Sequence, residues 1–130
     1  MKHKSAITLL GTACVLFAFV PLFAHHGTAA YDLQNTIVLK GTVTNFIWAN
    51  PHIQLFFDVK DDNGTIAHWA CEATGPGRLS RSGWTSHAVK PGDQIVVTIG
   101  PAKSGAHLGI LRKLVANGKT YSPDVDETPY

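Results

Sequence analysis

Four residues have side chains that commonly bind metal ions and positions that could bring them together: His25, His26, His52 and Glu72. If the chain is cleaved after Ala24, His25 becomes the N-terminal residue, and its α-amine and imidazole could chelate one metal ion together. Amine and imidazole nitrogens suit Cu(II), whereas imidazole combined with a carboxylate also suits zinc. These residues therefore predict a mononuclear copper or zinc site.

The alternative is that the histidines bind no metal. Two histidines near a chain end can simply be polar residues, and His52 beside Glu72 can be a surface pair of little energetic weight. Histidine clusters without fixed ligand spacing are a weak motif. If a ligand or cofactor does bind here, Trp48 and Asn50 are the residues expected beside it, because the segment Trp-Ala-Asn-Pro-His would place them with His52 at the mouth of the barrel.

Two strands joined by a tight turn would make His52 and Glu72 neighbours. Apolar and polar side chains alternate over residues 53–59 and again over 67–72, as in half-buried strands. The Asp-Asp-Asn-Gly segment at 61–64 is typical of a hairpin turn. The alternation requires the numbers of paired residues to sum to 124 or 126. With 124 His52 faces Glu72 directly, and with 126 the two residues are still diagonal neighbours.

The remaining strand signals predict an all-β fold. Residues 37–43 are rich in β-branched side chains, and the apolar parity then shifts near Thr44 and Asn45, which predicts a β-bulge. Further elements are expected as strands at 94–99 and 107–115 and a helix at 78–84 whose apolar contacts are Leu79 and Trp84. This order matches a small five-stranded OB-like Greek-key barrel with one short helix between strands three and four. An open sandwich is the alternative.

The N-terminal region predicts export. A basic start with Lys2 and Lys4 precedes an apolar run over residues 6–20, and the small residue Ala24 follows Pro21. This is the pattern of a signal peptide with its apolar signal helix, cleaved after Ala24. The alternative is an uncleaved membrane anchor, because an apolar run of about 20 residues can span a bilayer. In either case we expect the rest of the chain to be periplasmic or secreted.

The expected domain organisation has four parts. They are a signal peptide at 1–24, an irregular lead-in at 25–35, the barrel at 36–122 and a mobile acidic tail at 123–130. Asp32 could help to anchor the lead-in. Two of the 11 Lys and Arg residues lie in the signal, so the mature chain has equal numbers of basic and acidic residues. Such a near-neutral chain gives no electrostatic signal of nucleic-acid binding, and we expect no nucleic-acid partner.

The sequence shows no set of catalytic residues. It contains no Gly-x-Ser-x-Gly, no phosphate-cradling loop and no Cys-x-x-Cys. Cys14 lies in the signal, so Cys71 has no partner for an intrachain disulfide, and we expect a buried, unreactive thiol. We therefore expect a binding protein rather than an enzyme. One alternative is a metal-free accessory protein that holds an exported enzyme or envelope component; another is an oxidising copper enzyme.

The chain also carries an ordered set of short motifs: Ala-His-His at 24–26, Gly-Thr-Val at 41–43, Trp-Ala-Asn-Pro-His at 48–52, Trp-Ala-Cys-Glu at 69–72, Ser-Gly-Trp at 82–84 and Lys-Pro-Gly-Asp at 90–93. In this set it resembles an uncharacterised family of small exported bacterial proteins, a domain of unknown function. The resemblance implies export and a small β-barrel but no established activity. The histidines and the glutamate of the family pattern correspond to His25, His26, His52 and Glu72.

Overall fold

The structure is a computed structural model and describes residues 27–123. The expected signal helix, His25, His26 and the acidic tail from residue 124 onward lie outside the described residues. Over the described range, no helix combines the length and the apolar character needed to cross a membrane.

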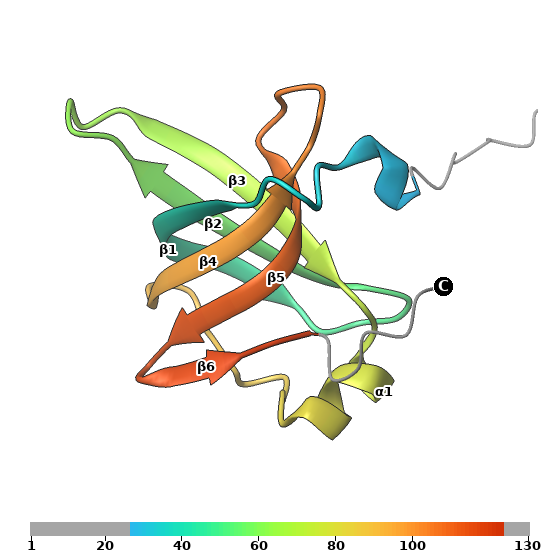
Figure 1. Cartoon of the computed structure of the whole chain (residues 1–130). Coiled ribbons are helices and arrows are strands. Elements are labelled where there is room, and N and C mark those ends of the chain that lie inside the picture. Colours follow the sequence, from blue (N-terminus) through green and yellow to red (C-terminus); the bar gives the residue numbers. More distant parts are fainter. Residues whose placement is uncertain (1–26, 124–130) are drawn as a thin grey trace, which may run out of the picture.

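The described strands form one sheet that closes into a barrel (Figure 1). They are β1 (Ile37–Ile47), β2 (Ile53–Lys60), β3 (Ile66–Ala73), β4 (Gln94–Pro101), β5 (Leu108–Ala116) and β6 (Lys119–Tyr121). Their order is β3-β2-β1-β4-β5-β6, and a parallel pairing of β3 with β5 closes the barrel. The predicted five-stranded OB-like barrel is therefore confirmed. The open sandwich is wrong, because its two sheets would not be joined by this pairing.

A β-bulge lets β1 pair with two strands in turn. Val43 pairs with Phe57 and Asn45 pairs with Phe56, so one extra residue lies between the two pairs, as the sequence predicts. The part of β1 before the bulge pairs with β4, and the part from Thr42 onward pairs with β2. Bulges bend the strand that contains them. Here the bend allows one strand to serve both sides of the barrel.

Close packing inside this bend requires a glycine at position 41. A Cβ atom on Gly41 would lie 2.7 Å from the carbonyl oxygen of Asp58 and 2.8 Å from a ring carbon of Phe57. The first of these contacts is with backbone, which cannot move aside without disturbing the ladder between β1 and β2.

We expect Gly41→Ala to lower the free energy of unfolding by about 1–3 kcal/mol, the usual cost of overpacking. Urea denaturation followed by circular dichroism measures this change. The control is Gly77→Ala, because nothing lies within 4 Å of a Cβ at that position. Equal stability of the two variants would show that the barrel does not need the close approach at Gly41.

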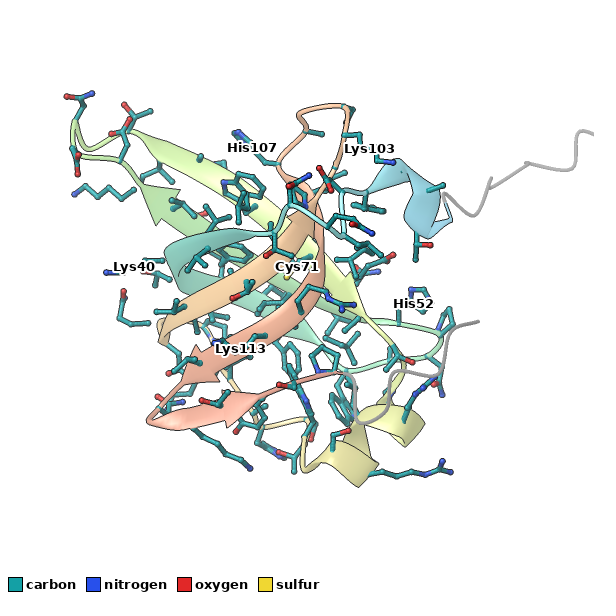
Figure 2. The ribbon with its side chains drawn as sticks, in the orientation of Figure 1. Lys40, His52, Cys71, Lys103, His107 and Lys113 are labelled. Carbon is teal, nitrogen blue, oxygen red and sulfur yellow. The ribbon has the colours of Figure 1, made fainter. Side chains whose placement is uncertain are left out.

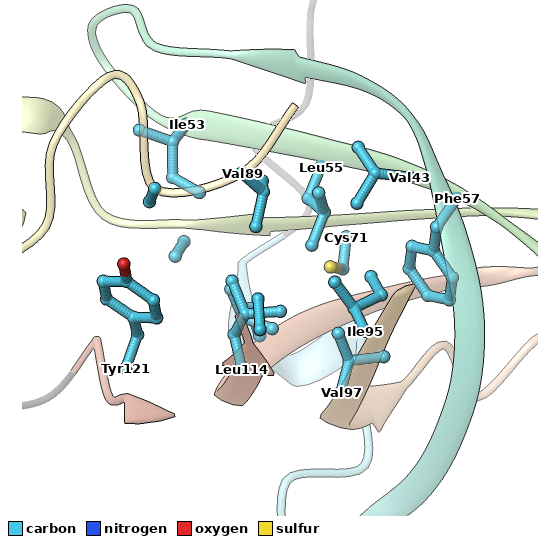
Figure 3. Close-up of a cluster of buried hydrophobic side chains, with 14 of the residues drawn as sticks. Val43, Ile53, Leu55, Phe57, Cys71, Val89, Ile95, Val97, Leu114 and Tyr121 are labelled. Carbon is cyan, nitrogen blue, oxygen red and sulfur yellow. The ribbon is translucent and has the colours of Figure 1, made fainter. Parts of the chain in front are cut away.

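The barrel interior is filled by apolar side chains from every strand. Cys71 lies inside, whereas Lys40 points away from the sheet (Figure 2). In Figure 3 side chains from separate strands meet around Cys71. The largest fully buried side chains are Trp84, Phe57, Ile53, Leu55, Leu79, Ile99, Leu111 and Leu114. Among the described residues no polar or charged residue is buried, so apolar packing holds this core together.

A short helical segment between β3 and β4 covers one end of the barrel. It consists of α1 (Pro76–Leu79) and a 3-10 turn at Ser80–Ser82. The predicted bounds of 78–84 are wrong. The helix begins at Pro76, because proline is favoured at the first helical position, and Gly83, with φ of 78°, ends the segment. The predicted apolar contacts are confirmed, since Leu79 and Trp84 are both buried.

β6 is a sixth strand that the sequence analysis did not predict. Asn117 and Gly118 have φ of 52° and 73°, and this two-residue turn pairs Ala116 with Lys119. Positive φ at both positions is the geometry that Asn-Gly favours in hairpins. β6 is three residues long, which is too short for a periodic pattern. It brings the Tyr121 ring to 4.8 Å from the ring of Trp84 in the cap.

Candidate functional site

The β2–β3 hairpin fixes the residues around Glu72. Leu55 faces Cys71 and Gln54 faces Glu72, so the paired numbers sum to 126. The turn explains this register. The amide of Asp61 donates to the carbonyl of Thr65 at 2.9 Å, so the loop between these two residues consists of the three residues 62–64. The register of 124, in which His52 would face Glu72 directly, is therefore wrong.

His52 and Glu72 are nevertheless neighbours. The Nδ1 atom of His52 lies 3.4 Å from Oε2 of Glu72, and the side chains are 48% and 35% exposed. His52 directly precedes β2, so it reaches Glu72 diagonally past Gln54. The predicted proximity of the two residues is confirmed. The pair presents an imidazole and a carboxylate to solvent on the outer face of the barrel.

The loop before His52 is packed against the start of α1. The Asn50–Pro51 peptide bond is cis. A Cβ atom on Gly75 would lie 2.6 Å from the carbonyl oxygen of Pro51 and 2.9 Å from Oδ1 of Asn50. Only glycine allows this approach without a shift of the loop. The position of His52 therefore depends on the contact between its loop and the cap of the barrel.

Trp48 and Asn50 are the residues expected beside a ligand or cofactor. Trp48 is half-buried against the core, with its ring centroid 6.0 Å from that of Phe46. Asn50 is exposed and lies against Gly75. Neither residue lines the groove beside Glu72 that is described below.

The lead-in is tied to the loop between β4 and β5. The amide of Asp32 donates to the carbonyl of Pro101 at 2.8 Å, and Tyr31 pairs with Ala102. Lys103 contributes twice: its amide donates to the carbonyl of Ala30 and its Nζ donates to the carbonyl of Ala29, both at 2.9 Å. Figure 2 shows Lys103 beside the lead-in. The backbone from residue 29 to residue 32 is thus held against the barrel.

Asp32 contributes to this anchor through its backbone, while its side chain shapes a local turn. Its carboxylate accepts hydrogen bonds from the amides of Gln34 and Asn35 and from the side chain of Asn35. The side-chain and backbone hydrogen bonds from Asn35 lower the pKa of the Asp32 carboxyl, with smaller contributions from Gln34 and Lys103.

Tyr31 is the residue of this site that the sequence analysis missed. The anchored lead-in places it beside a groove of about 290 Å³ at the junction of β3 and β5. The groove is lined chiefly by Tyr31, Gln54, Phe56, Ala70, Glu72 and Leu108. Burial, and secondly the negative charge of Glu72, raise the pKa of the Tyr31 phenol. No local pattern could have revealed this, because the pairing with Ala102 is remote in sequence.

The other described histidines have local partners. Nδ1 of His68 lies 2.6 Å from Oδ1 of Asp58, directly across the β2–β3 ladder. The ring of His107 stacks on Trp69 with 4.6 Å between centroids, and Nδ1 of His87 lies 3.1 Å from the hydroxyl of Ser86. Within residues 27–123, no three His, Cys, Asp or Glu residues are grouped closely enough to hold a metal ion. Within these residues, the His52–Glu72 pair has no third His, Cys, Asp or Glu beside it that could complete a metal site.

Cys71 has the properties expected of an inert thiol. It is buried under the groove and, among the described residues, has no disulfide partner. Burial, with a smaller contribution from Glu72, raises the pKa of the thiol to about 12. The reactive thiolate is therefore almost absent below this pH.

We expect Cys71 in the native protein to react with a thiol reagent at pH 8 more than about 100-fold more slowly than in the urea-unfolded chain, because both access and ionisation are blocked. Absorbance after addition of a chromogenic disulfide gives both rates. Rapid labelling of the native protein would contradict the burial of this residue.

The motifs that build this barrel and its His52–Glu72 pair can be compared with known proteins. No curated protein matches the chain. The model of the DUF6152 family, described as a family of unknown function, matches residues 13–112 and so includes both residues of the pair. Since this match extends over most of the sequence, the chain belongs to the DUF6152 family.

Proposed function

We propose that this chain is an exported β-barrel protein that binds one copper or zinc ion through His25, His26, His52 and Glu72. The observation that carries the proposal is the exposed His52–Glu72 pair, with 3.4 Å between Nδ1 and Oε2. The function is binding rather than catalysis, since no catalytic set accompanies these residues in the sequence.

The donor set of this pair fits such a metal. Imidazole nitrogen and carboxylate oxygen both bind zinc at about 2.0–2.2 Å, so two ligand atoms of a tetrahedral site are separated by roughly 3.3 Å. The observed separation of 3.4 Å is close to this value. Neither side chain is buried, so both can turn toward an ion without disturbing the core.

The anchored lead-in supports the contribution of His25 and His26. Both histidines lie outside the described residues, but the chain that follows them is held beside Glu72 through Tyr31. The five Cα–Cα steps from His26 to Tyr31 can span at most about 18 Å. The α-amine of His25 and the imidazoles of His25 and His26, placed beside Glu72, would complete a nitrogen-rich set of metal ligands. Such a set favours Cu(II) over zinc.

Native mass spectrometry of the protein isolated from the periplasm tests this proposal. We expect a chain that starts at His25 and takes up one Cu(II) or Zn(II) ion. His52→Ala should weaken binding by at least about tenfold, because loss of even an outer ligand partner typically costs 10–100-fold in metal affinity. One extra residue before His25 should weaken Cu(II) binding as well, because the nitrogen of His25 then becomes a peptide amide and the free α-amine is no longer on the same residue as the imidazole.

The matched control is His87→Ala, which removes an exposed histidine whose ring nitrogen contacts Ser86. Its metal affinity should equal that of the unchanged protein. A protein that takes up no metal, or whose His52→Ala variant binds as tightly as the control, would refute the proposal. The histidines would then be surface residues, and the accessory-protein alternative would be tested by searching for a protein partner.

A further inference from the structure

The groove beside Glu72 has apolar walls and a negatively charged end. Phe56, Ala70 and Leu108 supply apolar surface, and the ring of Tyr31 adds a second aromatic wall. Leu108 is 45% exposed, so part of its aliphatic surface is available to a ligand. Concave apolar surface with a few polar groups is the usual character of a small-molecule site.

The groove presents polar groups to a ligand. Within residues 27–123, the hydroxyl of Tyr31 and the side-chain amide of Gln54 make no side-chain hydrogen bond. Glu72 forms an ion pair with His52 at 3.4 Å, and its negative charge also acts on the phenol of Tyr31. None of the residues that line the groove is a lysine or arginine. Among the residues that line the groove, the charged one is Glu72, and its carboxylate lies beside uncharged hydrogen-bonding groups.

We propose that this groove binds a small organic ammonium ion, an amine that carries an aromatic or other apolar tail. The ammonium group would pair with the carboxylate of Glu72 and lie near the rings of Tyr31 and Phe56, whose faces attract cations. The tail would cover Ala70 and Leu108. An organic anion would instead meet the charge of Glu72, and the lining of the groove offers it no lysine or arginine.

This site shares Glu72 with the proposed metal site but requires no metal. Its walls come from β2, β3, β5 and Tyr31 of the lead-in, which all lie within the described residues. Binding measured in the metal-free protein therefore tests this inference alone. Failure of the metal proposal would leave it unaffected, and the reverse also holds.

The experiment is a titration of the metal-free protein, in the presence of EDTA, with 2-phenylethylamine. Chemical shifts of the backbone amides report where the amine binds. We expect saturable shifts centred on Ala70, Glu72 and Gly109. The control compound is 2-phenylethanol, which has nearly the same shape without the charge. It should bind about tenfold more weakly, the difference expected for one charge-assisted hydrogen bond.

Variants separate the charge from the apolar walls. Glu72→Gln keeps the size of the side chain and should remove the preference for the amine over the alcohol. Phe56→Leu keeps apolar volume but removes a ring, and should weaken the amine severalfold more than the alcohol. Asp58→Asn, a change to an acid paired with His68 farther along the same strand, should leave both affinities unchanged.

Three results would overturn the inference. The first is the absence of saturable shifts around the groove. The second is equal binding of the amine and the alcohol, or a preference that survives in Glu72→Gln. The third is binding of 2-phenylethylamine only after Zn(II) is added, because a metal and not the groove would then be its receptor.

Discussion

Three residue pairs between β3 and β5 close the barrel, and the candidate site depends on them. Ala70 pairs with Leu108, Cys71 with Gly109 and Glu72 with Ile110. These are the parallel pairs among the described strands, and the other ladders are antiparallel. Because the closure uses the end of β3, Glu72 lies where β3 meets β5. The groove lies along this junction, so the fold and the site share one set of contacts.

Much of this architecture follows from local patterns in the sequence. The alternation of apolar residues in β2 and β3 determines which side chains enter the core, and the parity shift near Thr44 marks the bulge. The same parity argument was sufficient to bring His52 and Glu72 to neighbouring positions. Cys71, which shares the inward parity, is buried as expected. These features were predictable because each depends on residues close together in the chain.

Other features depend on geometry that the sequence does not reveal. The hairpin register is set by a three-residue loop with Gly64 at a φ of 86°, and the composition of the turn fitted the wrong register equally well. The bounds of the short helix follow from Pro76 rather than from apolar spacing. Tyr31 reaches the groove through pairing with Ala102, some seventy positions later in the chain. Hence the sequence identified His52 and Glu72 as neighbours but did not reveal the groove that lies beside Glu72.

The tryptophans occupy environments that differ enough to act as separate optical reporters. Trp84 is buried in the cap, and its Nε1 donates to the carbonyl of Ser122 at 3.2 Å. Trp69 is half-buried beneath the ring of His107, and Trp48 lies four positions before His52. Emission from Trp84 follows the integrity of the fold, whereas Trp48 is the fluorophore nearest in sequence to His52. Unfolding should therefore change the emission of Trp84, which is buried, more than that of Trp48, which is already partly exposed in the folded protein.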